Sequence, residues 1–493
     1  LDMYNNPLLT KIKTVIEAVS GELVIDDSSN KSGLRKQEYP EYPIFKSFND
    51  SYVYYDNKNI FNGVYKRDNF SFHLKPFTID SLESYSTNGL WFPGTFRSSD
   101  IFPVFDDTLT IQSDYSLGFK RSTPKEGFPL YSGKSRYYNE IELGNNGLRG
   151  SGKFEYLTSV IHSENIIFFP DSTQLLSDAI AINEVNEGIE FPQTSNTKSY
   201  CNYEPYLDKL EVFQTHDMFN LYDGKASLQG NLLLKPVGLT GNGIMKLDLA
   251  EVSSKFFSFN STWFKADTAN LNVFDNSNNL AFSAKNLRAN IDVKDRDGMF
   301  FSNGIGSYVN FPASEYICYI DQLKWEMDKE QLTFGNNDPQ SKSRSEFISI
   351  NNEQDSLSFY AKSADYSLRD FIINAKGVDS LIVADAIIFP DSGNLIVERN
   401  AKIRTLSNSK IIIDSLVRYH VFNNSSVDIY SKNNYNASGD YIYTDANNIK
   451  QPIYFSEIKV NEDTLTFASG NVNKENDFKI GNRYNYYGDI LLV

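Results

Sequence analysis

The chain has 493 residues, of which 40% are hydrophobic and 14% aromatic, and its formal net charge is −16. This composition supplies large apolar cores, so a chain that is disordered throughout is excluded. The acidity excludes nucleic acid as a partner, because phosphate binding needs a concentrated lysine and arginine surface. No window of the sequence gathers such a surface.

The first predicted element is a short helix, which together with a polar linker occupies residues 1–36. Pro7 stands near its start and Gly21 follows its end. The apolar residues that recur at helical spacing between them are Leu8, Leu9, Ile12, Val15, Ile16 and Val19. The sequence begins at Leu1 without a signal-peptide pattern, and its last residues read as an interrupted strand. We therefore expect a processed chain or a fragment of a longer protein.

Residues 37–125 form a predicted N-terminal β module. Residues 51–55 and 70–74 alternate apolar and polar positions between turns, as strands do. The 36 phenylalanines and 31 tyrosines of the chain also favour strands. No run approaches the ~18–20 apolar residues of a membrane helix.

An internal repeat marks residues 126–256, which we predict to be tandem β repeats. Residues 130–152 match residues 221–243 without a gap, at an offset of 91 and with nine identities in 23 positions. Both copies contain a G-L-x-G-x-G motif, at Gly147 and at Gly238. Alternating strands follow the motif where a nucleotide-binding loop requires a helix, so these glycines indicate a turn or bulge with close backbone approach.

Residues 257–493 contain a second repeat and form a predicted solenoid-like region. Residues 264–269 parallel residues 359–364 at an offset of 95, and residues 282–287 give a further version of the same F-x-A motif. We expect the recurring alanines to face a close-packed interior, and lysine and aspartate to face water.

A third repeated motif occurs at residues 167–172 and at residues 387–392, and each copy is an apolar strand that ends in Pro-Asp-Ser. Proline stops a strand ladder and aspartate binds its own backbone, so this motif predicts a turn and not a functional site. From residue 372 to residue 460 strands recur every eight to twelve residues without helices, which excludes parallel βαβ units. The predicted fold is therefore all-β: an elongated β-repeat, either an open trough or stacked β modules, with one short N-terminal helix.

Two resemblances follow from these motifs. The F-x-A units and the segment 372–378 resemble the coils of envelope β-repeat proteins that carry lipopolysaccharide (the OstA-like domains), over residues 258–300 and 355–405. Residues 96–156 and 316–322 are similar to long, uncharacterised secreted or envelope proteins of Bacteroidota. The resemblance implies an open β-sheet with an apolar trough and a place in the cell envelope, in the periplasm or at the cell surface. It implies no catalytic residues.

The chain has few histidines and cysteines that could support catalysis or metal binding. His73, His162, His216 and His420 are isolated, and neither a metalloprotease motif nor a G-x-S-x-G nucleophile turn occurs. Cys201 and Cys318 are too few for a zinc site or a disulfide scaffold. We favour two buried thiols over a single bridge.

Carboxylate chemistry is the remaining enzymatic alternative, because two acids suffice for cleaving or lyase chemistry on polysaccharides. Its candidates are Asp267, Asp292, Asp295 and Asp297, although turn formation explains the segment 295–298 better than a calcium loop. The tyrosine clusters at 52–55, 137–138 and 484–487 could stack on sugars, and a structural role is favoured for them.

We therefore predict a non-enzymatic scaffold or assembly subunit of an outer-membrane-associated complex, with no catalytic, metal or cofactor site. Its expected partners are outer-membrane or other envelope proteins, which exposed edge strands would bind, and its trough would hold a lipid or a partner's strand. The alternative is a carbohydrate-binding or carbohydrate-cleaving β-helix protein. A polysaccharide would then be the ligand.

Overall fold

The computed structural model describes residues 14–27, 42–82, 90–335, 344–413, 420–481 and 483–492. These residues form strands, turns and single 3₁₀ turns and contain no α-helix, which confirms the all-β prediction. The chain divides into two compact units, residues 1–241 with 259–261 and residues 242–258 with 262–493. Within the described ranges, no helix has the length and hydropathy that crossing a membrane requires.

The N-terminal helix prediction is wrong in the part that the structure describes; residues 1–13 lie outside the described residues. Ile16–Glu17 (β1) is a strand that pairs with Ser51–Tyr54 (β4), with Ile16 opposite Val53. Gly21–Val24 (β2) is a strand as well. β-Branched Val15, Ile16 and Val19 are poor helix formers and good strand formers, so pairing with β4 outweighs the helical spacing.

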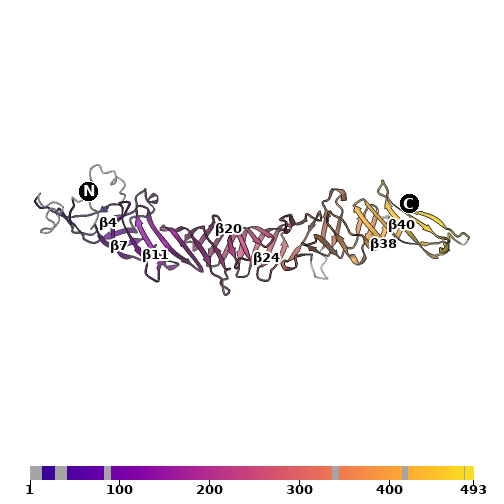
Figure 1. Cartoon of the computed structure of the whole chain (residues 1–493), viewed down its shortest axis with the longest axis horizontal. Coiled ribbons are helices and arrows are strands. Elements are labelled where there is room, and N and C mark those ends of the chain that lie inside the picture. The colour runs from indigo at the N-terminus through magenta and orange to yellow at the C-terminus, as the bar shows by residue number, and fades with distance from the viewer. Residues whose placement is uncertain are drawn as a thin grey trace. The chain divides into compact units, whose positions relative to one another are not determined.

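The N-terminal part of the first unit is an antiparallel sheet whose strands follow chain order (Figure 1). After β4 come Phe70–Leu74 (β5), Phe92–Ser98 (β7), Phe105–Ile111 (β8) and Leu117–Ser122 (β9). A small sheet joins β2 to Ile44–Ser47 (β3) and Thr78–Ile79 (β6). Aromatic rings fill the core: the centroids of Phe96 lie 5.3 Å from Phe70 and 5.2 Å from Phe119.

The repeat at an offset of 91 is a repeat of whole strands. Phe128–Leu130 (β10), Ser135–Gly144 (β11), Gly147–Tyr156 (β12) and Ser159–Phe168 (β13) form the first copy. Phe219–Leu221 (β19), Ala226–Lys235 (β20), Gly238–Leu247 (β21) and Ala250–Phe259 (β22) begin and end at the same offset. The predicted glycine bulge is confirmed: the register shifts between Gly150 and Gly152, where a Cβ atom on Gly152 would lie 2.1 Å from the carbonyl oxygen of Tyr138.

Between these long strands the first unit consists of short antiparallel strands, which are arranged in two rows side by side. One half of β13 pairs with Thr173–Leu176 (β14) and the other half with Ala179–Ile182 (β15). The first row continues through Ser199–Glu204 (β17) and Lys209–Gln214 (β18), and the second through Thr194–Asn196 (β16) and β19. Both rows end on β20, so each pair of short strands acts as one interrupted long strand.

In the long strands of the second unit, the alternation of buried and exposed residues is interrupted near the middle. We call this interruption the crease, and in residues 263–274 it lies at residues 267–268. In Trp263–Phe274 (β23), Phe264 and Ala266 are buried, the next two residues are exposed, and Ala269 and Leu271 are buried again. The 95-residue repeat reproduces this pattern in Ser358–Ala361 (β31) and Ser363–Ser367 (β32), where Phe359, Ala361, Ala364 and Tyr366 are buried. The F-x-A motif therefore places alanines on the buried face on either side of a crease, as predicted.

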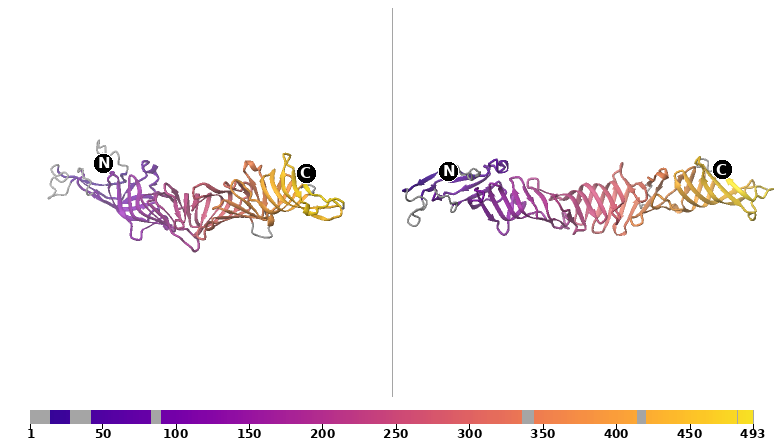
Figure 2. Two further views of the ribbon diagram at one scale, coloured as in Figure 1. Left: turned by 45° about the vertical axis from the view of Figure 1, so that its right-hand side comes forward. Right: turned by 45° about the horizontal axis from the view of Figure 1, so that its top comes forward.

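The second unit also splits into two rows after Leu280–Asp292 (β24). One row contains Asp297–Ser302 (β25), Gln322–Glu326 (β28), Gln331–Gly335 (β29), β32, Ile372–Lys376 (β33) and Leu395–Val397 (β36). The other contains Tyr308–Phe311 (β26), Tyr316–Tyr319 (β27), Ser345–Ser349 (β30) and β31. The further views in Figure 2 show the same succession of strands within each unit.

An eight-stranded antiparallel sheet completes the second unit. Its strands are Leu381–Val383 (β34), Ala386–Phe389 (β35), Leu406–Ile413 (β37), His420–Ser431 (β38), Asn434–Thr444 (β39), Lys450–Val460 (β40), Thr466–Val472 (β41) and Gly488–Leu492 (β42). Among the described residues the 3₁₀ turns are Phe61–Gly63, Tyr131–Gly133, Met327–Lys329, Asn352–Gln354, Asp391–Gly393 and Lys474–Asn476. Both Pro-Asp-Ser corners follow a strand, and in each the serine hydroxyl donates to the preceding aspartate.

Candidate functional site

Of the four candidate aspartates, the structure brings Asp292 and Asp297 opposite each other and keeps Asp267 apart from them. Asp292 and Asp297 face each other at the turn between β24 and β25, where Asp292 Oδ1 accepts the backbone N–H groups of Lys294 and Asp295 at 2.8 Å each. Asp267 lies at the crease of β23, close to the position of Arg288 and about 13 Å along the sheet from Asp292. The turn explanation therefore accounts for the cluster.

The histidines and cysteines are equally separate. His73 Nε2 lies 2.9 Å from Asp50 Oδ2, and His420 Nδ1 lies 3.3 Å from the Tyr441 hydroxyl. Within the described ranges, no three His, Cys, Asp or Glu side chains gather as metal ligands would. Cys201 and Cys318 are buried free thiols, as favoured from the sequence, and burial raises the pKa of both. Neither is therefore a thiolate nucleophile at neutral pH.

The tyrosine clusters have mainly structural contacts. Tyr55 is buried and its hydroxyl donates to the carbonyl of Leu117 at 2.9 Å. Tyr52 and Tyr54 stack on the outer face of β4, with ring centroids 5.9 Å apart. Tyr138 lies beneath the ammonium group of Lys153, 3.8 Å from the ring centroid. In the third cluster, Tyr484 and Tyr487 are exposed.

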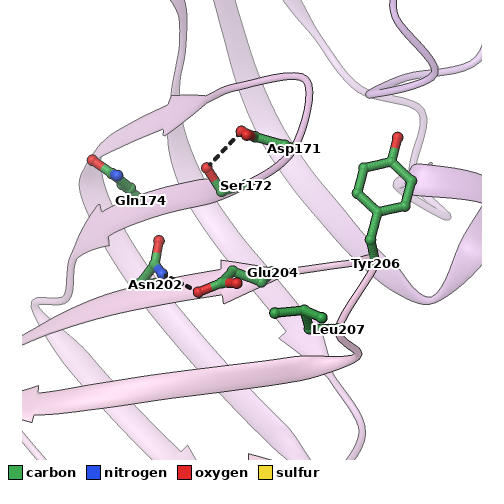
Figure 3. Close-up of a pocket in the computed structure, with 7 residues that line it drawn as sticks. All are labelled: Asp171, Ser172, Gln174, Asn202, Glu204, Tyr206 and Leu207. Atoms are coloured by element: carbon green, nitrogen blue, oxygen red, sulfur yellow. Dashed lines mark hydrogen bonds between the residues drawn. The ribbon is translucent and has the colours of Figure 1, made fainter.

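A shallow hollow with a volume of about 280 Å³ lies on the outer face of the first unit. We call it the β14–β17 pocket, and Figure 3 shows the residues that line it: Asp171, Ser172, Gln174, Asn202, Glu204, Tyr206 and Leu207. Gln174 and Asn202 are direct cross-strand partners, so their side chains leave the same face of the sheet. Their neighbours Thr173, Leu175 and Tyr203 point inward and are buried.

Two turns build the walls of this pocket. The Pro-Asp-Ser corner after β13 supplies Asp171 and Ser172, and the turn between β17 and β18 supplies Tyr206 and Leu207. The Tyr206 ring stands at one side of the hollow (Figure 3), and 72% of its surface is exposed. The turn prediction for the corner is confirmed, yet the corner also contributes to a pocket that the sequence did not reveal.

The polar groups of the pocket are only partly bonded to one another. Asn202 Nδ2 donates to Glu204 Oε1 at 3.0 Å, and Lys209 Nζ lies 3.1 Å from the same carboxylate. The Oδ1 atom of Asn202 is buried and has no hydrogen-bond partner in the structure. Other buried side-chain acceptors share this state, among them Oδ1 of Asn196 and of Asn310, but only Asn202 lines the pocket.

The outer edge of β42 is the second candidate site. β42 pairs with β41, with Ile490 opposite Gly470, and no described strand pairs with its other side. Its exposed positions include Leu491, and its register with β41 has no bulge. The strand is five residues long and has no lysine, proline or bulge, and its one charged residue is the exposed Asp489.

No periodicity identifies either candidate site. The pocket residues come from two turns and from the polar side of two strands. In the sequence, these polar positions do not differ from those of an ordinary solvent-exposed strand face. Comparison with protein-family models, with curated proteins and with solved structures finds no match to this chain.

Proposed function

We propose that this protein is a non-enzymatic β-repeat component of the cell envelope, and that it acts as a scaffold that receives a strand of another envelope protein along β42. The observation that carries the proposal is the edge of β42 with which no described strand pairs. Unpaired backbone N–H and C=O groups along an extended edge are the template for strand addition.

The side chains of β42 suit this role. Ile490 and Leu492 continue the apolar face of β41, where Ala468 and Val472 are buried, but both remain partly exposed. Leu491, 64% exposed, lies on the opposite face. An added strand would bury apolar area on both faces of β42, in addition to forming main-chain hydrogen bonds.

The apolar interior favours a partner's strand over a lipid as the ligand. In the second unit Phe311 lies 5.3 Å from Phe334 and 4.8 Å from Tyr366, between ring centroids. The rings of Phe347 and Phe359 stack at 5.1 Å. These side chains pack against one another on the inner face of the second unit, which supports a partner strand rather than a lipid as the ligand.

The placement in the envelope rests on the resemblance to envelope β-repeat proteins. The non-enzymatic role is supported by the isolated histidines, by the two buried thiols and by the turn hydrogen bonds of Asp292. The acidic surface supports a partner that is not anionic.

Lysine substitution on the edge strand tests the proposal. We expect Leu491→Lys to reduce co-purification of envelope proteins with the full chain at least about ten-fold, because a charge on an edge strand opposes strand addition. Ile442→Lys is the matched control: Ile442 is exposed on β39, which pairs with β38 and β40 on its two sides. Equal recovery of partners with both variants would contradict the proposal.

A further inference from the structure

The β14–β17 pocket combines polar side chains with an exposed aromatic ring, and this combination suits a sugar. Its volume of about 280 Å³ lies just below the range of about 300–1,000 Å³ that holds drug-sized ligands. One ring-sized polar unit fits a hollow of this size. We propose that the pocket binds one residue of a neutral oligosaccharide.

The hydrogen-bonding groups match hydroxyls. A sugar hydroxyl both donates and accepts, and the pocket offers the amides of Gln174 and Asn202 beside the carboxylates of Asp171 and Glu204. Because Asn202 Nδ2 is engaged by Glu204, the orientation of the amide is fixed, with Oδ1 as the unpartnered acceptor. A hydroxyl of the ligand would satisfy this acceptor after a small adjustment of the side chain.

The aromatic wall supplies the apolar contact that sugars need. Tyr206 projects from the turn between β17 and β18, and its ring is available on the pocket side (Figure 3). Its hydroxyl lies 3.5 Å from the carbonyl oxygen of Pro170, which holds the ring near the Pro-Asp-Ser corner. The C–H face of a sugar ring can pack on this ring while its hydroxyls reach the strands.

The charges of the pocket select against acidic sugars. No lysine or arginine lines it, whereas two carboxylates do. Two cations lie beside the pocket and are already engaged: Lys209 pairs with Glu204 and Glu211 at 3.1 Å, and Lys134 pairs with Asp208 at 3.4 Å. A uronate or a phosphorylated sugar would therefore meet like charge, and a neutral sugar would not.

An apolar row beside the pocket provides room for a longer ligand. Leu176, Tyr200 and Phe213 are exposed on the same outer face, on β14, β17 and β18, where Leu176 faces Tyr200 and Tyr200 faces Phe213. The rings of Tyr200 and Phe213 lie 5.9 Å apart. This row is two residues from Gln174 and Asn202, about 7 Å along the strands, so a chain of sugars could contact both.

Calorimetric titration of the full chain tests the proposal. The probes are neutral hexasaccharides of glucose, mannose and N-acetylglucosamine, with hexagalacturonic acid as the acidic counterpart. We expect at least one neutral probe to bind more tightly than about 1 mM and hexagalacturonic acid to bind more weakly. Tyr206→Ala should weaken binding about ten-fold or more, and Asn202→Asp should weaken it as well, because it replaces the donor to Glu204 by a charge.

Matched variants separate this site from general effects. Tyr206→Phe keeps the ring and should retain binding, and Tyr430→Ala removes an exposed tyrosine from β38, away from the pocket, and should leave binding unchanged. No binding of any neutral probe, equal binding by the Tyr206→Ala variant, or tighter binding of hexagalacturonic acid would overturn the proposal. Because the pocket does not include β42, these outcomes are independent of the scaffold proposal.

Discussion

At the scale of residues, the repeat provides matched positions whose surroundings differ. Gly147 and Gly238 occupy the same place in the two copies and both have positive φ, 80° and 136°. A Cβ atom on Gly147 would lie 2.5 Å from the Phe61 ring and 3.0 Å from the Tyr65 hydroxyl, whereas a Cβ atom on Gly238 would meet no atom within 4 Å. The two sites therefore differ in packing and also in φ.

Alanine substitution at these two glycines gives a direct comparison. We expect Gly147→Ala to lower the free energy of unfolding by about 1–3 kcal/mol more than Gly238→Ala, because overpacking adds to the shared cost of positive φ. Thermal and urea unfolding of both variants would measure the difference. Equal destabilisation would mean that the Phe61 ring moves aside freely.

Buried tyrosines predict how stability depends on alkaline pH. Tyr55, Tyr65 and Tyr203 are buried, and desolvation raises the pKa of each phenol, that of Tyr203 to about 12. A raised pKa in the folded state means that the stabilisation is complete below pH ~10 and is lost as the pH rises toward 12. Each such tyrosine then lowers the free energy of unfolding by about 1.4 kcal/mol per pH unit.

Absorbance at 295 nm and circular dichroism, followed together from pH 9 to pH 12.5, would test this expectation. Ionisation of the buried tyrosines should coincide with loss of the β signal, and Tyr203→Phe should make the pH dependence shallower. Full ionisation of all the tyrosines in a chain that keeps its β signal would contradict it.

At the scale of elements, the crease determines which residues of a long strand are buried. Ala266 on β23 is buried, and its neighbour Asp267 is exposed at the crease. We expect Ala266→Leu to destabilise the protein by about 1–3 kcal/mol through overpacking, and Asp267→Leu to change stability by less than about 0.5 kcal/mol. Chemical denaturation would measure both, and a similar effect at the two sites would show that the buried face is misassigned.

The sequence carries much of this element-level structure. The repeats at offsets of 91 and 95 predict equivalent strands, and the buried alanines and the glycine bulge follow from the same motifs. The strand lengths are predicted less well: Asn434–Thr444 (β39) is a strand of 11 residues, and polar residues on its outer face hide the period. At Ile16 the helical spacing of the apolar residues predicts the wrong structure, because Ile16 pairs with Val53, which is distant in sequence.

The candidate sites are less predictable than the fold for a physical reason. Tyr206 and Asn202 meet the Pro-Asp-Ser corner only because β14 and β17 are neighbours, and this pairing skips two strands in chain order. The edge of β42 that lacks a described partner strand likewise depends on which strands pair and not on local composition.

At the scale of the whole molecule, each unit is a succession of antiparallel strands whose inner face is filled by its own side chains. Such an array has few internal places for a ligand and offers partners mainly its edges and its outer face. The β42 edge is an example of such an edge, and the β14–β17 pocket is an example of a site on the outer face.

Hydrogen–deuterium exchange of the β42 amides tests the central claim most directly. The full chain would be compared alone and in the complex purified from its source envelope, with β39 as the internal reference. Addition of a partner strand predicts that exchange of the amides on the outer edge of residues 488–492 slows about ten-fold or more in the complex, while exchange in β39 stays the same. Unchanged exchange in β42, or a chain that is recovered only as a free monomer, would contradict the account.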